Sequence, residues 1–201
     1  MGTVSTSVGN LAIDASAHFN KESKRNTFSG ALSTGNFNLG TLLGNNDLGA
    51  LALAMNVDVA LAGKKLDGTF NSDLNYFDYK GYRYNNISAD ISLDRNHCEG
   101  KLFVGDENVE IIADGALDLA AENTSLDLEV DVAKVDFSKI NLWKKFPDKV
   151  LSFNASAKLV GNNPDNITGN FQFTKNRNIS FYGSVYFKIA NGCQIPFYLH
   201  S

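Results

Sequence analysis

Three carboxylates occupy alternate positions in residues 125–133, SLDLEVDVA, and they are the first candidates for chemistry in this chain. Asp127, Glu129 and Asp131 alternate with aliphatic residues, and successive side chains of an extended strand point to opposite faces. The carboxylates therefore share one face about 7 Å apart, a spacing that a glycosidase pair or a calcium site could use. Because no histidine or aromatic sugar-binding surface surrounds them, the favoured interpretation is a solvated outer face.

Other reactive residues give no stronger indication of catalysis. His97, Cys98 and Glu99 are consecutive and alternate between faces, so they cannot all bind one ion in a regular strand. Cys98 and Cys193 lack metal-ligand spacing and could pair or stay free. No Gly-x-Ser-x-Gly motif and no usable Cys/His pair is present. We therefore expect a protein that is not an enzyme and that uses no metal or cofactor.

An aromatic group surrounds the dipeptide Lys80-Gly81 and consists of Tyr76, Phe77, Tyr79, Tyr82 and Tyr84. Such a group could form the aromatic girdle of an outer-membrane barrel or a sugar-binding platform. A β-turn at Lys80-Gly81 flanked by cross-strand aromatic pairs explains it more simply, and we predict that arrangement.

Composition limits the classes of partner. The chain has 201 residues, is 43% hydrophobic and 20% charged, and has a net charge of -4. It has no basic stripe, so nucleic acid is not an expected partner. No apolar run reaches the roughly 18 residues of a membrane-spanning helix, and no export signal opens the chain at Met1-Gly2. We expect an excised segment of a longer protein.

Alternation of apolar and polar residues recurs almost from end to end and predicts strands. Turn-forming residues separate the alternating stretches, so a meander of hairpins is expected. The clearest stretches are 11–19, 51–61, 87–93, 109–113, 125–133 and 151–159. Helix is indicated only at 38–45 and at 137–147, which ends at Pro147.

Two further regularities indicate a curved and repetitive sheet. Glycines stand two positions from apolar residues, as in Phe28-Gly30-Leu32, where they remove bulk from the apolar face and let a sheet bend. Residues 53–63 align with 151–161, and 37–42 with 135–140, at a constant offset of 98 positions. We predict an all-β fold in which a curled antiparallel sheet of successive hairpins forms a taco-like groove with an apolar interior.

The apolar face of such a sheet needs a cover, because exposing it would cost on the order of tens of kcal/mol at about 25 cal/mol per Å². A second sheet, a packed barrel interior, a bilayer and an apolar ligand are the four possible covers. A β-sandwich is the alternative fold and implies a structural or adhesive module. The glycines and the repeat favour the groove.

The chain resembles the AsmA/TamB family of Gram-negative envelope proteins over about residues 10–175. The resemblance rests on the segments FNLGTLL and VDFSKINL, each followed by a long strand, and on the run 68–119 with YKGYRYNNIS and GDENVEIIADGALDL. It implies a periplasmic groove within an inner-membrane-anchored protein that supports phospholipid transport and outer-membrane biogenesis. A barrel protein of the TamA type is an implied partner. The domain spans 1–201, and 176–201 is an atypical tail.

The groove hypothesis assigns acyl-chain contacts to the apolar face, with headgroups at the open edge in water. The expected lipid-binding residues are Leu53, Val57, Leu61, Phe70, Leu74, Ile91, Leu102, Ile111, Leu126, Leu128, Val130, Leu151, Phe153 and Phe171. In a β-sandwich the same residues would form the ordinary core.

Overall fold

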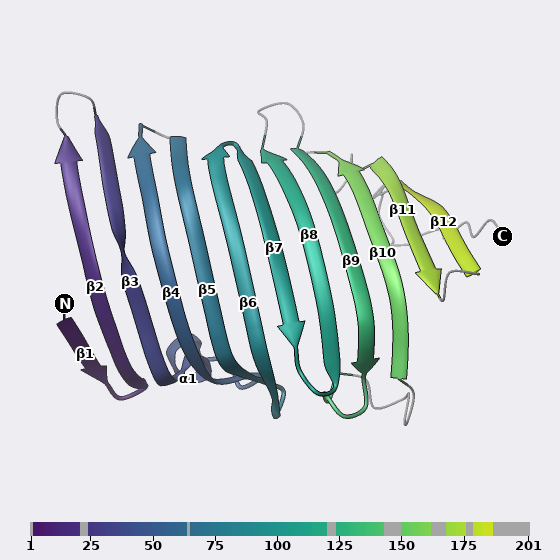
Figure 1. Ribbon diagram of the computed structural model, residues 1–201, viewed down its shortest axis with the longest axis horizontal. Helices are drawn as coiled ribbons and strands as arrows, with labels where there is room; N and C mark the ends of the chain where they lie inside the picture. The colour runs from purple at the N-terminus through teal and green to yellow at the C-terminus, as the bar shows by residue number, and fades with distance from the viewer. Residues whose placement is uncertain are drawn as a thin grey trace.

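The computed structural model describes residues 2–20, 24–63, 65–119, 124–142, 150–161, 168–175 and 179–186. These residues form one antiparallel sheet of twelve strands, in which each strand pairs with its neighbours in sequence (Figure 1). The strands are β1 (Gly2–Thr6), β2 (Gly9–Asn20), β3 (Arg25–Asn38), β4 (Leu48–Ala62), β5 (Lys65–Tyr79), β6 (Tyr82–Arg95), β7 (His97–Gly105), β8 (Val109–Leu119), β9 (Thr124–Asp136), β10 (Val150–Val160), β11 (Thr168–Lys175) and β12 (Ile179–Tyr186). The predicted meander of hairpins is confirmed.

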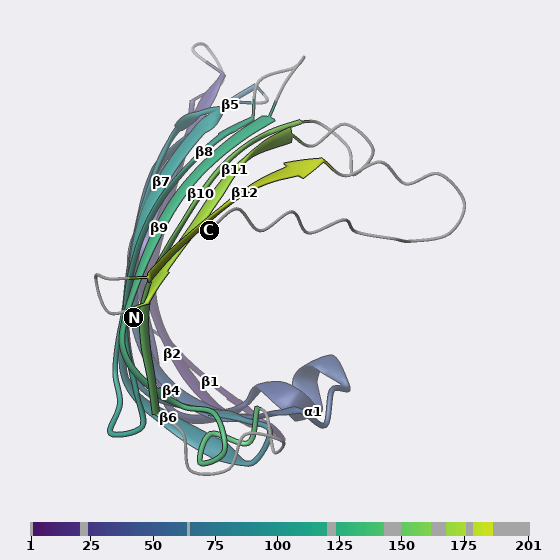
Figure 2. The same ribbon diagram turned by 90° about the vertical axis from the view of Figure 1, so that its right-hand side faces the viewer.

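The sheet is curled along the direction of its strands. Seen along the row of strands, each strand follows the arc of a C whose mouth is open (Figure 2). The sheet does not close into a barrel, because β1 and β12 stand at opposite ends of the strand order. The described residues thus form a single-layer trough, which confirms the predicted curled fold.

Strand register places apolar residues in continuous rows across the sheet. In one row Val57 lies opposite Phe70, and Phe70 lies opposite Ile91. Further along the same row Leu128 lies opposite Ala157, which lies opposite Phe171. Because the side-chain period of a strand is two, matched register on successive hairpins keeps most of the large apolar residues on one face.

The bending of the strands has a cause that the glycine pattern did not predict. The register shifts in several strand pairs, between Thr34 and Phe37, Ala52 and Leu53, Glu110 and Ile111, and Leu151 and Phe153. These irregularities lie near the same strand ends, and a β-bulge bends its strand and increases the local twist. Aligned bulges therefore help to curl one side of the trough.

Some glycines of the predicted pattern are required by close backbone approach. A Cβ atom on Gly68 would overlap the carbonyl oxygen of Asp58 and lie 2.6 Å from the Cα of Val59. Gly100 is less restricted, since the nearest atoms to its added Cβ would be 3.6 Å away.

We expect Gly68→Ala to lower the free energy of unfolding by about 1–3 kcal/mol, because the backbone of β4 or β5 would have to move. Gly100→Ala is the matched control and should change it by less than about 1 kcal/mol. Urea unfolding of both variants measures the difference. Equal losses would show that the close approach at Gly68 carries no strain.

The two predicted helices differ in outcome. The first is confirmed as α1 (Leu39–Leu43), whose N-cap residue Asn38 accepts a hydrogen bond from the Thr41 amide at 2.8 Å. The second is wrong over 137–142, which form turns, while 143–147 lie outside the described residues. The side chain of Asp136 accepts from the Lys139 amide at 3.3 Å, so the two segments begin with equivalent caps at the predicted offset.

Few side chains of the described residues are fully buried. One buried cluster consists of Val104, Val109, Val132, Val135 and Ile140. It lies at the strand ends next to the 137–142 turn, and Ile140 is 1% exposed. Residues 137–142 thus act as a local plug on the apolar face. No helix in the described part of the chain is long and apolar enough to span a membrane.

The predicted tail, 176–201, falls largely outside the described residues. Only 179–186 are placed, as β12, which continues the sheet beyond β11. Cys193 also lies outside the described residues.

Candidate functional site: the apolar inner face

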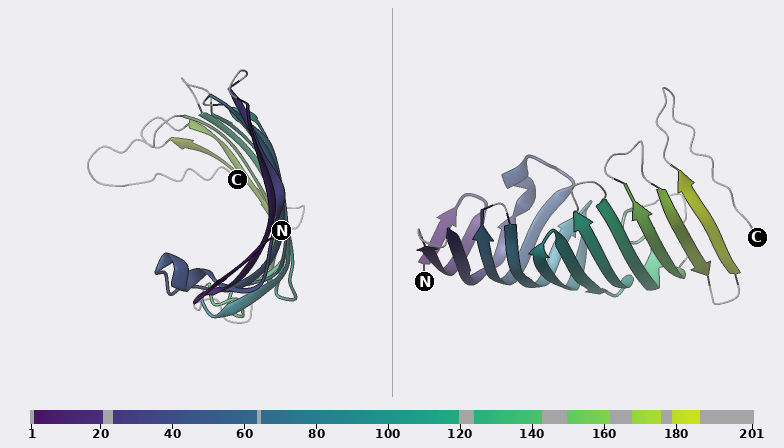
Figure 3. Two further views of the ribbon diagram at one scale, coloured as in Figure 1. Left: turned by 90° about the vertical axis from the view of Figure 1, so that its left-hand side faces the viewer. Right: turned by 90° about the horizontal axis from the view of Figure 1, so that it is seen from above.

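The apolar face of the sheet is the concave one. α1 lies on the inner side of the curve (Figure 2; Figure 3, left). The green turn segment after β9 lies at the same rim, and its Ile140 packs against Val104 and Val132. Because these two valines belong to the apolar rows, those rows face into the trough. We call the rim that carries α1 and residues 137–142 the α1 rim, and the rim at the opposite strand ends the far rim.

All fourteen predicted groove residues lie on this face, and none of them is fully buried. The most open are Leu61, Ile91, Leu102 and Phe171, with exposed fractions between 36% and 40%. Their neighbours in the rows cover their flanks, whereas no second layer of described residues covers their tips. An aliphatic surface that remains half-exposed over so many strands is unusual for a soluble protein and typical of a binding surface.

The structure divides the predicted residues into two groups. The first group packs against the buried cluster that contains Ile140 and so contributes to the core of the protein. It consists of Ile111, Val130, Leu151 and Phe153. The other ten line the open trough, where nothing in the described chain covers them. Leu61 stands near the far rim, opposite Asn26 and Leu66.

Sequence reasoning missed a hollow on the first strands of the trough. It has a volume of about 280 Å³ and lies over β2, β3 and β4. Its apolar lining includes Ile13, Ala15, Phe28, Leu32 and Met55 beside the predicted Val57. The alternation over 11–19 and the Phe28-Gly30-Leu32 pattern were the signals that could have identified these residues.

No known protein family, curated protein or solved structure matches this chain. What the groove can do must therefore be derived from its own residues.

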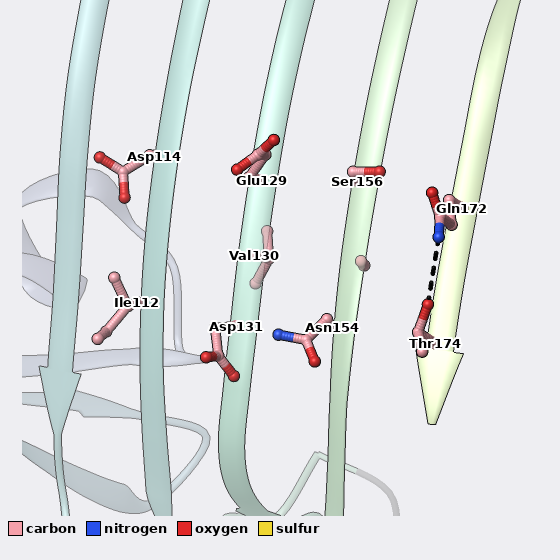
Figure 4. Close-up of a pocket in the computed structure, with 10 residues that line it drawn as sticks. Ile112, Asp114, Glu129, Val130, Asp131, Asn154, Ser156, Gln172 and Thr174 are labelled. Carbon is pink, nitrogen blue, oxygen red and sulfur yellow. Dashed lines mark hydrogen bonds between the residues drawn. The ribbon is translucent and has the colours of Figure 1, made fainter. Parts of the chain in front are cut away.

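The convex face is mainly polar, although Phe103 and Ile112 are exposed on it. It carries the three carboxylates of β9. Asp127 pairs with the Lys158 ammonium at 2.7 Å, while Glu129 and Asp131 are exposed. Figure 4 shows Glu129 and Asp131 beside a shallow hollow of about 340 Å³, together with Asp114, Asn154 and Gln172 of neighbouring strands. No three His, Cys, Asp or Glu side chains of the described residues converge to hold a metal ion.

His97 and Glu99 also lie on the convex face, whereas Cys98 points to the apolar face, as strand alternation requires. His97 contacts Glu99 at 2.9 Å and Asp118 at 2.6 Å. These hydrogen bonds raise the pKa of His97 above its usual value. The group is a surface cluster in which the imidazole of His97 bridges two carboxylates.

The aromatic group forms the predicted cross-strand pairs. Tyr79 lies opposite Tyr82, and Phe77 lies opposite Tyr84, on either side of the Lys80-Gly81 turn. Both turn residues have positive φ angles, +49° and +74°, which a tight two-residue hairpin turn requires. These aromatic residues therefore stabilise the hairpin at the α1 rim, and Tyr82 and Tyr84 also pack against the buried cluster.

A buried polar network anchors the same rim. Asp106 is 5% exposed and accepts hydrogen bonds from Tyr82 Oη, the Asn108 amide, and both the amide and Nδ2 of Asn85. Burial by itself would raise the pKa of Asp106, but these donors outweigh burial and lower it. Burial and the Asp106 hydrogen bond raise the pKa of Tyr82 to about 12.

Asp106 should make the protein sensitive to acid. Because its pKa is lower in the folded state than in the unfolded state, its stabilising contribution is present above the unfolded value near 4 and is lost as the pH falls through the folded value. We expect Asp106→Ala to lower the free energy of unfolding at pH 7 by about 1–3 kcal/mol and to flatten its decline below about pH 4. Urea unfolding across pH measures both effects. Asp131→Asn on the convex face is the control, and an equal flattening there would contradict the assignment.

Proposed function

We propose that this chain is a lipid-conducting groove that supports phospholipid transport between membranes. The observation that carries the proposal is the continuous apolar inner face, which is half-exposed along an open, single-layer trough. An elongated apolar ligand fits this shape better than a compact one, because the apolar rows run from strand to strand along the whole trough.

The proposed mechanism is passive. Each methylene that leaves water contributes about 0.8 kcal/mol, so an acyl chain in the trough is held by many small contributions. These contacts have no preferred direction, and equivalent apolar residues recur on β2 to β11, so movement along the trough meets low barriers. The open mouth of the trough leaves polar headgroups in water. The sequence contains no nucleotide-binding motif, so the driving force comes from a partner or a gradient.

The resemblance to the AsmA/TamB family extends the proposal. On that basis the groove works in the periplasm of a Gram-negative bacterium and belongs to a protein anchored in the inner membrane. Phospholipid acyl chains are its cargo, and an outer-membrane barrel of the TamA type is its proposed protein partner. The proposed role is non-enzymatic.

Lipid extraction tests the proposal directly. The purified chain is incubated with phospholipid vesicles, reisolated and examined by native mass spectrometry for bound lipid. We expect phospholipid adducts that survive reisolation and disappear after detergent washing. A chain that stays folded and carries no lipid would overturn the proposal and would favour a structural or adhesive module.

A further inference from the structure

The hollow over β2, β3 and β4 lies where the middle row of the inner face has its smallest side chains. Ala15 lies opposite Gly30, and Gly30 lies opposite Val57. Further along the same row, β5 carries Phe70 and β6 carries Ile91. The floor of the trough is therefore lower on β2 and β3, where it consists of a methyl group and a hydrogen atom.

Close packing of β2 against β3 keeps Gly30 without a side chain. A Cβ atom on Gly30 would overlap the carbonyl oxygen of Asp14 and lie 2.6 Å from the Cα of Ala15. A larger residue at this position would have to move the backbone of one of the two strands. The hollow is thus a consequence of strand pairing.

A second pair of glycines in the same row is covered by its neighbours. Gly100 lies opposite Gly115. A Cβ atom on Gly115 would lie 3.2 Å from Cδ1 of Leu128, and one on Gly100 would lie 3.6 Å from a side-chain atom of β6. At Gly30 the nearest atoms are backbone atoms and one methyl group of β2. Of these two glycine sites on the inner face, the described side chains therefore leave the one over β2 to β4 open.

The lining of the hollow is apolar. Among the described residues, no charged side chain lines it. Ser16 and Ser29 contribute to the lining, but strand alternation directs their hydroxyls to the convex face, where the two Oγ atoms lie 3.0 Å apart. Water in the hollow would find few polar partners, whereas a hydrocarbon needs none.

The size and the walls of the hollow fit a ring-shaped ligand. Its volume of about 280 Å³ is almost twice the roughly 150 Å³ of an apolar cavity that binds one benzene molecule. The side chain of Phe28 is 39% exposed, and its ring meets that of Phe19 edge to face with centroids 5.8 Å apart. Leu32 and Met55 lie on the other side of Gly30 along the strands. A methionine thioether adapts its shape and makes favourable contacts with aromatic rings.

We infer that the hollow binds a flat, uncharged compound of about two six-membered rings, which lies over Gly30 between Phe28 and Met55. This site goes beyond the proposed function, because the transport of acyl chains does not require it. A straight chain contacts the inner face along one side, whereas a ring in the hollow contacts the floor and both walls. More apolar surface therefore leaves water for each atom of the ring.

Binding of N-phenyl-1-naphthylamine tests the inference. This probe is uncharged, carries a naphthyl and a phenyl ring, and fluoresces strongly in apolar surroundings. We expect the full chain to bind it. Ala15→Leu places an isobutyl group on the floor of the hollow and should weaken binding on the order of tenfold, because it displaces contacts equivalent to about two methylene groups.

Two matched variants add the same isobutyl group elsewhere. Ala89→Leu adds it to the inner face on β6, where Ala89 lies between Ser72 and Leu102. Ala54→Leu adds it to the convex face of β4, where Ala54 is exposed. Both variants should bind the probe as tightly as the unmodified chain.

Met55 provides a second readout that needs no substitution in the hollow. The chain has two methionines, Met1 and Met55, so isotope labelling of the methionine methyl groups gives two NMR signals, which Met55→Leu assigns. Ring currents of the bound probe should shift the Met55 signal in the unmodified chain. This measurement still decides the question if Ala15→Leu fails to fold.

Probe binding without a shift of the Met55 signal would overturn the inference. Equal losses of affinity in Ala15→Leu and Ala89→Leu would overturn it as well, and so would a folded chain that binds no probe. Phospholipid capture from vesicles is measured separately on the same proteins. Capture without probe binding would leave the proposed function standing while the inference fails, and probe binding without capture would do the reverse.

Discussion

Replacing Val57 with aspartate is expected to reduce lipid capture by more than tenfold while the protein stays folded. Val57 lies in the open part of the trough between Gly30 and Phe70, and it also lines the hollow over the first strands. A carboxylate there would lose hydration against an acyl chain, and an unpaired charge in apolar surroundings is strongly disfavoured. Without lipid the same carboxylate remains in water at the open mouth, so the loss of unfolding free energy should be about 1–2 kcal/mol.

Asn56→Asp is the matched control, since it adds the same charge one residue away on the exposed convex face. It should leave lipid capture unchanged. Leu128→Asp, further along the same apolar row, should repeat the effect of Val57→Asp. Vesicle incubation followed by native mass spectrometry measures capture, and circular dichroism with urea unfolding measures the fold. Full capture by the folded Val57→Asp protein would show that the trough does not hold the lipid.

Phe153 does not provide an equivalent test, although sequence reasoning grouped it with Val57 and Leu128. Its ring lies 4.7 Å from the ring of Phe173, and it packs against the buried cluster near Ile140. A charge at Phe153 would therefore disturb the fold as well as the groove. We expect Phe153→Asp to unfold the protein under conditions in which Val57→Asp remains folded.

Replacing Ile140 with alanine is expected to lower the free energy of unfolding by about 2–5 kcal/mol. Ile140 is 1% exposed and is the largest fully buried side chain of the described residues. Its removal would leave a cavity among four valines that belong to three neighbouring strands, β7, β8 and β9. Because Ile140 packs on three neighbouring strands, its replacement should also reduce the cooperativity of unfolding. Urea unfolding followed by circular dichroism measures both quantities.

The internal repeat supplies the control for Ile140. Leu42 occupies the equivalent position in the first copy, at the offset of 98, but its side chain is 57% exposed on α1. Leu42→Ala should therefore change the free energy of unfolding by no more than about 0.5 kcal/mol. Similar losses of unfolding free energy for Leu42→Ala and Ile140→Ala would contradict this difference. They would mean that Leu42 is as well packed in solution as Ile140.

The alternating stretches predicted the strands, their order and the composition of their faces. That success has a physical basis, since a period of two is local and a one-residue slip would expose every apolar side chain. The fourteen groove residues could be placed on one face for the same reason. The Lys80-Gly81 turn could also be predicted from the sequence, because few residues tolerate the positive φ angles that it requires.

Alternation within single strands could not predict which groove residues are covered. Ile140 comes from a turn, and its burial depends on where that turn folds back over β7 to β9. The aligned bulges were also hidden, because a bulge depends on register between strands and leaves little trace in either strand alone. The hollow over β2 to β4 likewise depends on register.

The sequence by itself determined that a long antiparallel sheet has one continuous apolar face, because hydrophobic periodicity is a local property of each strand. Only the tertiary structure decided that residues 137–142 fold over this face at one rim and that most of the face within the described residues stays uncovered. Bulges and burial arise from pairing between strands, and pairing brings together residues that the sequence keeps far apart.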